Sequence, residues 1–163
     1  MHGRVWTEFE VQQPASKVWE IYGTLKLATL ILQKLPQYAE KIEFDGDGGV
    51  GTVLTVTFSN GTRGFGTLKE SFVVIDDEKR VKVAEVSEGG FLDQGITSYR
   101  TTLEIAEKEG GSSIIRSSID FEVDDENASK TPAITTAGLT LIAKMVAEHL
   151  AERDGEKKGP VDA

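Results

Sequence analysis

Alternation of apolar and polar residues predicts β-strands along most of the chain. In residues 4–11, Val5, Phe9 and Val11 fall on one face and polar residues dominate the other, which is typical of a half-buried strand. Strand patterns separated by turn signals recur from residue 38 to 123 and favour an antiparallel sheet. We expect these later strands at roughly 39–45, 52–58, 65–75, 79–86, 97–106 and 112–123.

Two segments have the period of a helix instead. Apolar residues between positions 14 and 36 have helical spacing, and Gly23 divides them into two predicted short helices. Residues 131–153 carry a broad apolar face at the same spacing and predict one long C-terminal helix. Residues 154–163 are polar and contain two glycines and a proline, so we expect a flexible tail.

The order of these elements is strand, two short helices, six strands and one long helix. We therefore predict an α+β fold in which a curved seven-stranded antiparallel sheet wraps around the C-terminal helix, because this arrangement buries both apolar faces. The length of 163 residues is typical of one domain. We place that single ligand-binding domain at residues 1–153, with an internal cavity between sheet and helix.

Composition narrows the classes of function. A net charge of −9 argues against nucleic acid or an anionic membrane as the main partner, because both need a basic surface. The chain has no cysteine, which excludes disulfides and thiolate metal sites, and its two histidines are isolated in sequence, so we expect no metal. The N-terminus lacks the apolar core of a signal peptide, and we expect a cytoplasmic protein.

The stretch "GDGGVG" satisfies a dinucleotide-binding pattern through Gly46, Gly48 and Gly51. That pattern needs a helix after the glycines, because the helix N-terminus holds the pyrophosphate. Here "TVLTVTF" follows, an alternating β-branched strand. We therefore interpret the glycines as the turn of a hairpin at the cavity mouth, where they permit positive φ angles.

Two charged residues lie within predicted strands. Glu70 shares a face with Leu68 and Phe72, the more apolar face, so we expect it to point inward. Lys82 lies on the next strand, where the pattern does not decide which face is inside. A buried charge is costly unless it is paired or functional, and from the residues alone a structural ion pair or a solvated Lys82 is the simpler interpretation.

Two separated motifs add a resemblance. "GDGGVGT", "EGGFLDQG" about 40 residues later and the terminal helix resemble the plant pathogenesis-related class 10 family, the birch-pollen-allergen type, over residues 4–152. "TLKESF" and "GSSIIRSSIDFEVDDE" are more similar to its norcoclaurine synthase-like and norbelladine synthase-like branch. The resemblance implies a helix-grip (START-like) fold with a large apolar cavity. It also implies a cofactor-free condensation of an aromatic ethylamine, such as dopamine, with an aromatic aldehyde in alkaloid biosynthesis.

The resemblance also implies roles for particular residues. Glu70 matches the family's catalytic glutamate, and Lys82, six residues before Glu88, matches its acid/base lysine. Leu68 and Thr101 stand where the family has a tyrosine and an aspartate that orient the amine. With both polar groups replaced, a carrier of a phytohormone (cytokinin or gibberellin) or phenolic metabolite is the alternative function.

We expect a small aromatic or hormone-like ligand as the partner of a monomer or weak dimer. Further candidate ligand-binding residues, apolar or aromatic, are Leu35, Leu54, Phe58, Phe72, Phe91, Tyr99, Leu141, Ile142 and Val146. Of these, Tyr99 has a hydroxyl that can meet a polar ligand atom.

Overall fold

A computed structural model describes residues 1–59 and 66–157. Its seven strands form one antiparallel sheet in the order β1-β7-β6-β5-β4-β3-β2, which confirms the predicted fold. The elements are β1 (His2–Val11), α1 (Ala15–Tyr22), α2 (Lys26–Lys34), β2 (Ala39–Asp45), β3 (Val53–Phe58), β4 (Thr67–Asp76), β5 (Val81–Gly89), η1 (Gly90–Gln94), β6 (Ile96–Lys108), β7 (Ser112–Val123), η2 (Asp125–Ala133) and α3 (Ala137–Lys157).

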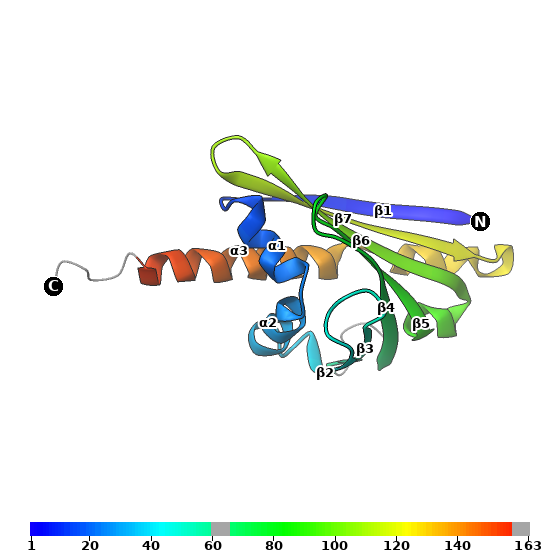
Figure 1. Ribbon diagram of the computed structural model, residues 1–163. Coiled ribbons are helices and arrows are strands. Elements are labelled where there is room, and N and C mark those ends of the chain that lie inside the picture. The colour runs from blue at the N-terminus through cyan, green and yellow to red at the C-terminus, as the bar shows by residue number, and fades with distance from the viewer. Residues whose placement is uncertain (60–65, 158–163) are drawn as a thin grey trace.

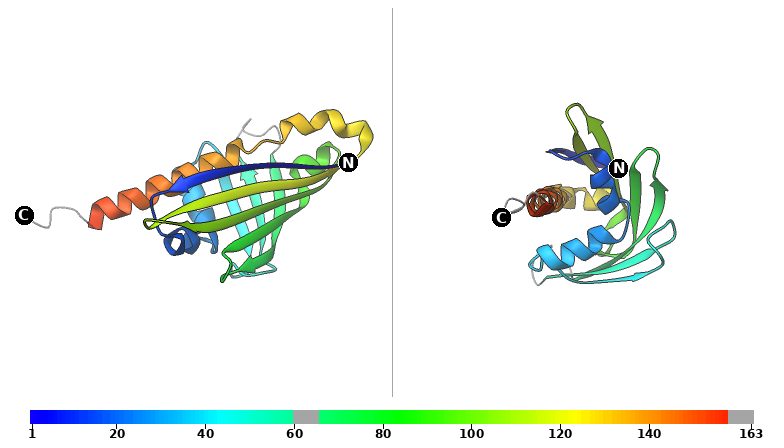
Figure 2. Two further views of the ribbon diagram at one scale, coloured as in Figure 1. Left: turned by 90° about the horizontal axis from the view of Figure 1, so that it is seen from above. Right: turned by 60° about the vertical axis from the view of Figure 1, so that its left-hand side comes forward.

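The sheet curves around α3, as the view along the helix in Figure 2 shows. Helices α1 and α2 connect the edge strand β1 to the opposite edge strand β2 (Figure 1). The core lies between these helices and the concave face of the sheet, where apolar residues of every layer are buried. Within the described ranges, none of the helices combines the length and the hydropathy needed to cross a membrane.

Helix α3 differs from its prediction at both ends. It begins at Ala137 rather than 131, because η2 occupies Asp125–Ala133 and Ile134 is extended. Thr135 and Thr136, which lie between Ile134 and Ala137, are β-branched. The hydroxyl of Thr135 accepts a hydrogen bond from the Ala137 N–H at 3.4 Å, an arrangement that favours a helix start.

At its other end α3 continues to Lys157, so the first four residues of the predicted tail are helical. The side chain of Gln13 donates to Asp154 at 2.6 Å, and Lys17 lies 3.6 Å from the same carboxylate. These contacts connect the last turns of α3 to the loop before α1 and to α1 itself. Residues 158–163 of the predicted tail, and residue 65 of the predicted strand 65–75, lie outside the described residues.

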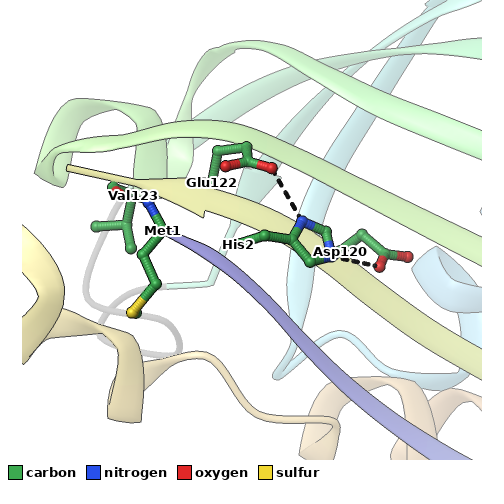
Figure 3. A network of polar contacts seen from close by, with 5 residues as sticks. All are labelled: Met1, His2, Asp120, Glu122 and Val123. Carbon is green, nitrogen blue, oxygen red and sulfur yellow. Dashed lines mark hydrogen bonds and ion pairs between the residues drawn. The ribbon is translucent and has the colours of Figure 1, made fainter. Parts of the chain in front are cut away.

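The N-terminus is held against β7 by polar contacts (Figure 3). The Met1 ammonium donates to the carbonyl of Val123 at 2.7 Å. The two ring nitrogens of His2 lie 2.9 Å from Glu122 and 3.2 Å from Asp120. These contacts extend the pairing of β1 with β7 to the first residues of the chain.

The glycine-rich segment is a hairpin turn, as predicted. β2 and β3 pair antiparallel on either side of it, and Gly46, Gly48 and Gly51 have φ angles of 127°, 99° and 94°. A Cβ on Gly48 would lie 3.1 Å from the side chain of Leu25, which lines the internal cavity. The turn therefore packs close to the cavity wall.

Candidate active site

An apolar cavity lies between the concave face of the sheet, α2 and the start of α3. Its volume is about 140 Å³, close to the space that a single benzene-sized ligand needs. Its polar lining comes from a few residues, among them Glu70, Lys82 and Thr101.

Lys82 points into this cavity, which settles the face that the pattern left open. Lys82 is only 4% exposed. Ala84 and Val86, which lie on the same face of β5, also line the cavity. The Lys82 Nζ donates to the main-chain carbonyl of Tyr22 at 2.7 Å. It also lies 4.1 Å from the centre of the Phe72 ring, in cation–π geometry.

Burial changes the protonation of this lysine. Desolvation lowers the pKa of Lys82 from 10.5 to about 8, although the nearby Glu70 carboxylate partly raises it again. A pKa near 8 leaves both protonation states accessible around neutral pH, as proton transfer to and from a reacting molecule requires.

Glu70 lies on the inner face of β4, as its pattern predicted. It pairs with Leu54 on one side and Val86 on the other, and all three residues line the cavity. A register shift between Lys69 and Glu70 marks an irregularity in the ladder. β4 and β5 thus bring Glu70 and Lys82 to the same cavity, close enough for the carboxylate to act on the ammonium.

Most of the other sequence-predicted residues meet at the same cavity. Phe91 from η1 stacks on Tyr99 of β6 with ring centres 5.5 Å apart, and Thr101 is opposite Ala84 on β5. The predicted residues that line the cavity are Leu54, Phe58, Leu68, Phe72, Phe91, Tyr99, Thr101 and Ile142.

The structure places three predicted residues away from this cavity. Leu35, which follows α2, and Val146 of α3 are buried in the core. Leu141 is 37% exposed on α3. The apolar spacing of α3 identified a broad face, but only the part that includes Leu139 and Ile142 contacts the cavity. Leu141 lies between these two residues in sequence but on the exposed side of α3, and Val146 lies one turn beyond Ile142, in the core.

The cavity wall formed by α2 was missing from the prediction. Leu27, Ala28 and Ile31 of α2 line the cavity. Their spacing of one and three residues along the chain is typical of one face of a helix, so the sequence pattern did indicate an inward-pointing face. The sequence did not indicate the Tyr22 carbonyl that binds Lys82, because every residue has a main-chain carbonyl and the residue pattern does not mark this one. Among the described residues, no three His, Asp or Glu side chains are grouped to hold a metal ion.

The curved sheet, the long helix and the apolar cavity between them define a class of small-ligand-binding fold. The chain belongs to the Pathogenesis-related protein Bet v 1 family, which it matches over residues 1–153. It is 46% identical over 154 residues to norbelladine synthase from Narcissus pseudonarcissus, across 94% of each chain. It is 36% identical to S-norcoclaurine synthase from Thalictrum flavum subsp. glaucum, across 92% of this chain and 73% of that protein.

Solved structures agree with these relatives. Norcoclaurine synthase from Thalictrum flavum in complex with dopamine and hydroxybenzaldehyde superposes with a TM-score of 0.86 at 35% identity, over 93% of this chain and 88% of that one. A point mutant of the same enzyme with a transition-state analogue gives 0.88 at 35% identity, over 94% and 97%. The predicted family and branch are therefore confirmed.

Proposed function

We propose that this protein catalyses the cofactor-free condensation of an aromatic ethylamine with an aromatic aldehyde, and that Lys82 and Glu70 are its catalytic residues. The observation that carries the proposal is the buried Lys82 amine, which faces an apolar cavity together with Glu70. The relatives named norbelladine and norcoclaurine synthase, and the related complex with dopamine and hydroxybenzaldehyde, support this choice of substrates.

The proposed chemistry begins at the aldehyde. The amine nitrogen attacks the carbonyl carbon and forms a carbinolamine, which then loses water to give an imine. The Lys82 ammonium donates a proton to the departing hydroxyl, and the resulting neutral amine takes the proton that the nitrogen releases, so that the lysine is regenerated. Its pKa of about 8 suits both roles near neutral pH.

Ring closure, where it follows, needs a base. The Lys82 ammonium returns its proton to the imine nitrogen, a ring carbon of the ethylamine attacks the resulting iminium carbon, and the Glu70 carboxylate accepts the ring proton whose loss restores aromaticity. Transfer of that proton from Glu70 to the Lys82 amine then restores both residues. Leu68 and Thr101 offer fewer polar groups to orient a catechol than the tyrosine and aspartate that the resemblance implied. We therefore expect imine formation to outpace stereoselective cyclisation, because orientation contributes several kcal/mol to such steps.

The size of the cavity suggests how the substrates are arranged. A volume of about 140 Å³ suits one aromatic ring. One reactant accordingly fills the interior beside Lys82, and the second reaches it from the mouth.

The test is turnover of dopamine with 4-hydroxyphenylacetaldehyde or 3,4-dihydroxybenzaldehyde, measured by chromatography after reduction of the imine. We expect Lys82→Met to lower product formation to the level of buffer alone and Glu70→Gln to reduce it strongly. Lys69→Met removes an exposed lysine of β4 and serves as the matched control, because it faces away from the cavity.

Equal product from wild type, Lys82→Met and buffer would contradict the proposal. Saturable binding of either reactant, or of a cytokinin or gibberellin, by a protein without turnover would instead favour the carrier. The apolar wall, including Leu68, is the feature that fits that second function.

A further inference from the structure

Helix α1 meets the β4–β5 hairpin at two points. At the turn of the hairpin, the indole N–H of Trp19 donates to the carboxylate of Asp77 at 2.9 Å. On β5, Lys82 donates to the carbonyl of Tyr22 at 2.7 Å. Trp19 and Tyr22 are three residues apart and so lie on the same side of the helix.

The carbonyl that binds Lys82 belongs to the end of the helix. Tyr22 is the last residue of α1, where carbonyl groups have no partner from a following turn. The Lys26 N–H, which a continued helix would direct at this carbonyl, donates to Thr24 Oγ1 at 3.2 Å instead. The C-terminal end of a helix carries partial negative charge, which suits an ammonium.

The end of α1 is itself fixed by packing. The side chain of Tyr22 is buried, with 1% of the residue exposed. Gly23 follows directly, and a Cβ there would lie 2.6 Å from Cε2 of Trp19, so the indole packs against the main chain. The Trp19 ring is thus held between Gly23, which follows α1, and Asp77 in the turn of the hairpin.

We propose that Trp19 and Asp77 are positioning residues: their hydrogen bond holds the end of α1 at the distance at which the Tyr22 carbonyl directs the Lys82 amine into the cavity. A lysine side chain has four rotatable bonds and no preferred direction of its own. One fixed N–H···O bond and the Phe72 ring beneath the amine restrict it to one orientation. This inference rests on the proposed role of Lys82 in catalysis.

The test compares Trp19→Phe and Asp77→Ala, which remove the hydrogen bond, with Asp77→Asn, which keeps an acceptor oxygen but removes the charge. Glu78→Ala is the control, because it removes a neighbouring exposed carboxylate from the same turn. We expect kcat for imine formation to fall roughly ten- to a hundredfold in the first two variants, with KM almost unchanged, because misplacement of a catalytic group acts on the reaction step. Asp77→Asn and Glu78→Ala should remain close to wild type.

A second measurement reports on the lysine without turnover. Because the Phe72 ring lies 4.1 Å from Lys82 Nζ, we expect its ring current to shift the NMR signals of the adjacent methylene protons upfield. These signals are assigned by their disappearance in Lys82→Met. We expect this shift to shrink in Trp19→Phe and Asp77→Ala and to persist in Asp77→Asn and Glu78→Ala.

The two measurements separate the two proposals. Wild-type kcat and an unchanged Lys82 signal in Trp19→Phe and Asp77→Ala would overturn the positioning role. An Asp77→Asn variant as impaired as Asp77→Ala would also overturn it, because the charge rather than the hydrogen bond would then matter. A wild-type protein without turnover contradicts the proposed condensation, and the NMR signal still decides whether Trp19 and Asp77 position Lys82.

Discussion

The two faces of strand β5 carry charges in opposite settings. On the outer face, Glu85 accepts from Arg100 of β6 at 2.7 Å, and the side chains are 39% and 48% exposed. On the inner face, three residues earlier, Lys82 is 4% exposed and faces an apolar cavity.

The two settings differ in their exposure to water, because Lys82 and Arg100 both carry a charge at neutral pH. Water screens the outer pair, so its contribution to stability is small. The inner lysine has lost most of its water, and the pKa of Lys82 falls to about 8 for that reason. The sheet therefore carries its outer charges at little cost, whereas it retains a costly inner charge. Retention of such a group is the physical argument for function at Lys82.

The largest effect that we expect comes from Phe72, whose ring supports Lys82 on the inner face. Phe72→Ala should lower the free energy of unfolding by about 3–5 kcal/mol, because it removes a buried ring, enlarges the cavity that Phe72 lines and removes the cation–π contact. Val74 of the same strand is 41% exposed, and Val74→Ala is the matched outer substitution. It should cost less than about 1 kcal/mol.

Urea denaturation monitored by circular dichroism measures both values. Similar losses in Phe72→Ala and Val74→Ala would mean that the inner and outer faces of β4 are equally packed, contrary to the comparison.

The second prediction concerns the cost of burying Lys82. A pKa lowered from 10.5 to about 8 corresponds to roughly 3 kcal/mol in favour of the neutral form. Lys82→Met should therefore raise the free energy of unfolding at pH 7 by up to about 3 kcal/mol, less the contribution of the lost bond to Tyr22. The same variant should lose its turnover, as expected of a residue kept for function rather than stability.

The pH dependence gives the sign of this effect. Below about pH 8 the lysine is charged in both states and the folded protein bears the cost of burial. Between about pH 8 and 10.5 the unfolded chain binds more protons, so the wild type gains stability as the pH rises. The advantage of Lys82→Met should then shrink across this range, while Lys69→Met follows the wild type. An advantage that is absent at pH 7, or constant up to pH 10.5, would contradict the prediction.

The sequence predicted the sheet well because alternation is a local signal. The ranges 39–45 and 112–123 match β2 and β7 residue for residue, and Gly23 separates the two short helices as expected. The start of α3 was wrong, since apolar spacing continues through residues 131–136 although the main chain there is not α-helical. Periodicity reports which residues are apolar, and it does not report where helical hydrogen bonds begin.

The candidate site was predictable only in part, for a related reason. Glu70 was placed by its apolar neighbours, but both faces of the segment around Lys82 carry apolar and charged residues, so only the structure orients it. The contact of Lys82 with the Tyr22 carbonyl joins residues 60 positions apart, and such a contact depends on packing rather than on local pattern. The volume of the cavity depends in the same way on how side chains from α2, α3 and the sheet fill a shared space.

The smallest effect that we expect tests the outer face of β5. Glu85→Gln removes the charge of the carboxylate that Arg100 contacts but retains its shape and an acceptor oxygen. Because exposed ion pairs contribute less than about 1 kcal/mol, the free energy of unfolding should change by no more than that, and the change should disappear in high salt. Turnover should equal that of the wild type, since the side chain points away from the cavity. A large, salt-insensitive loss would mean that the outer charges of the sheet are as strongly coupled to their surroundings as Lys82 is on the inner face.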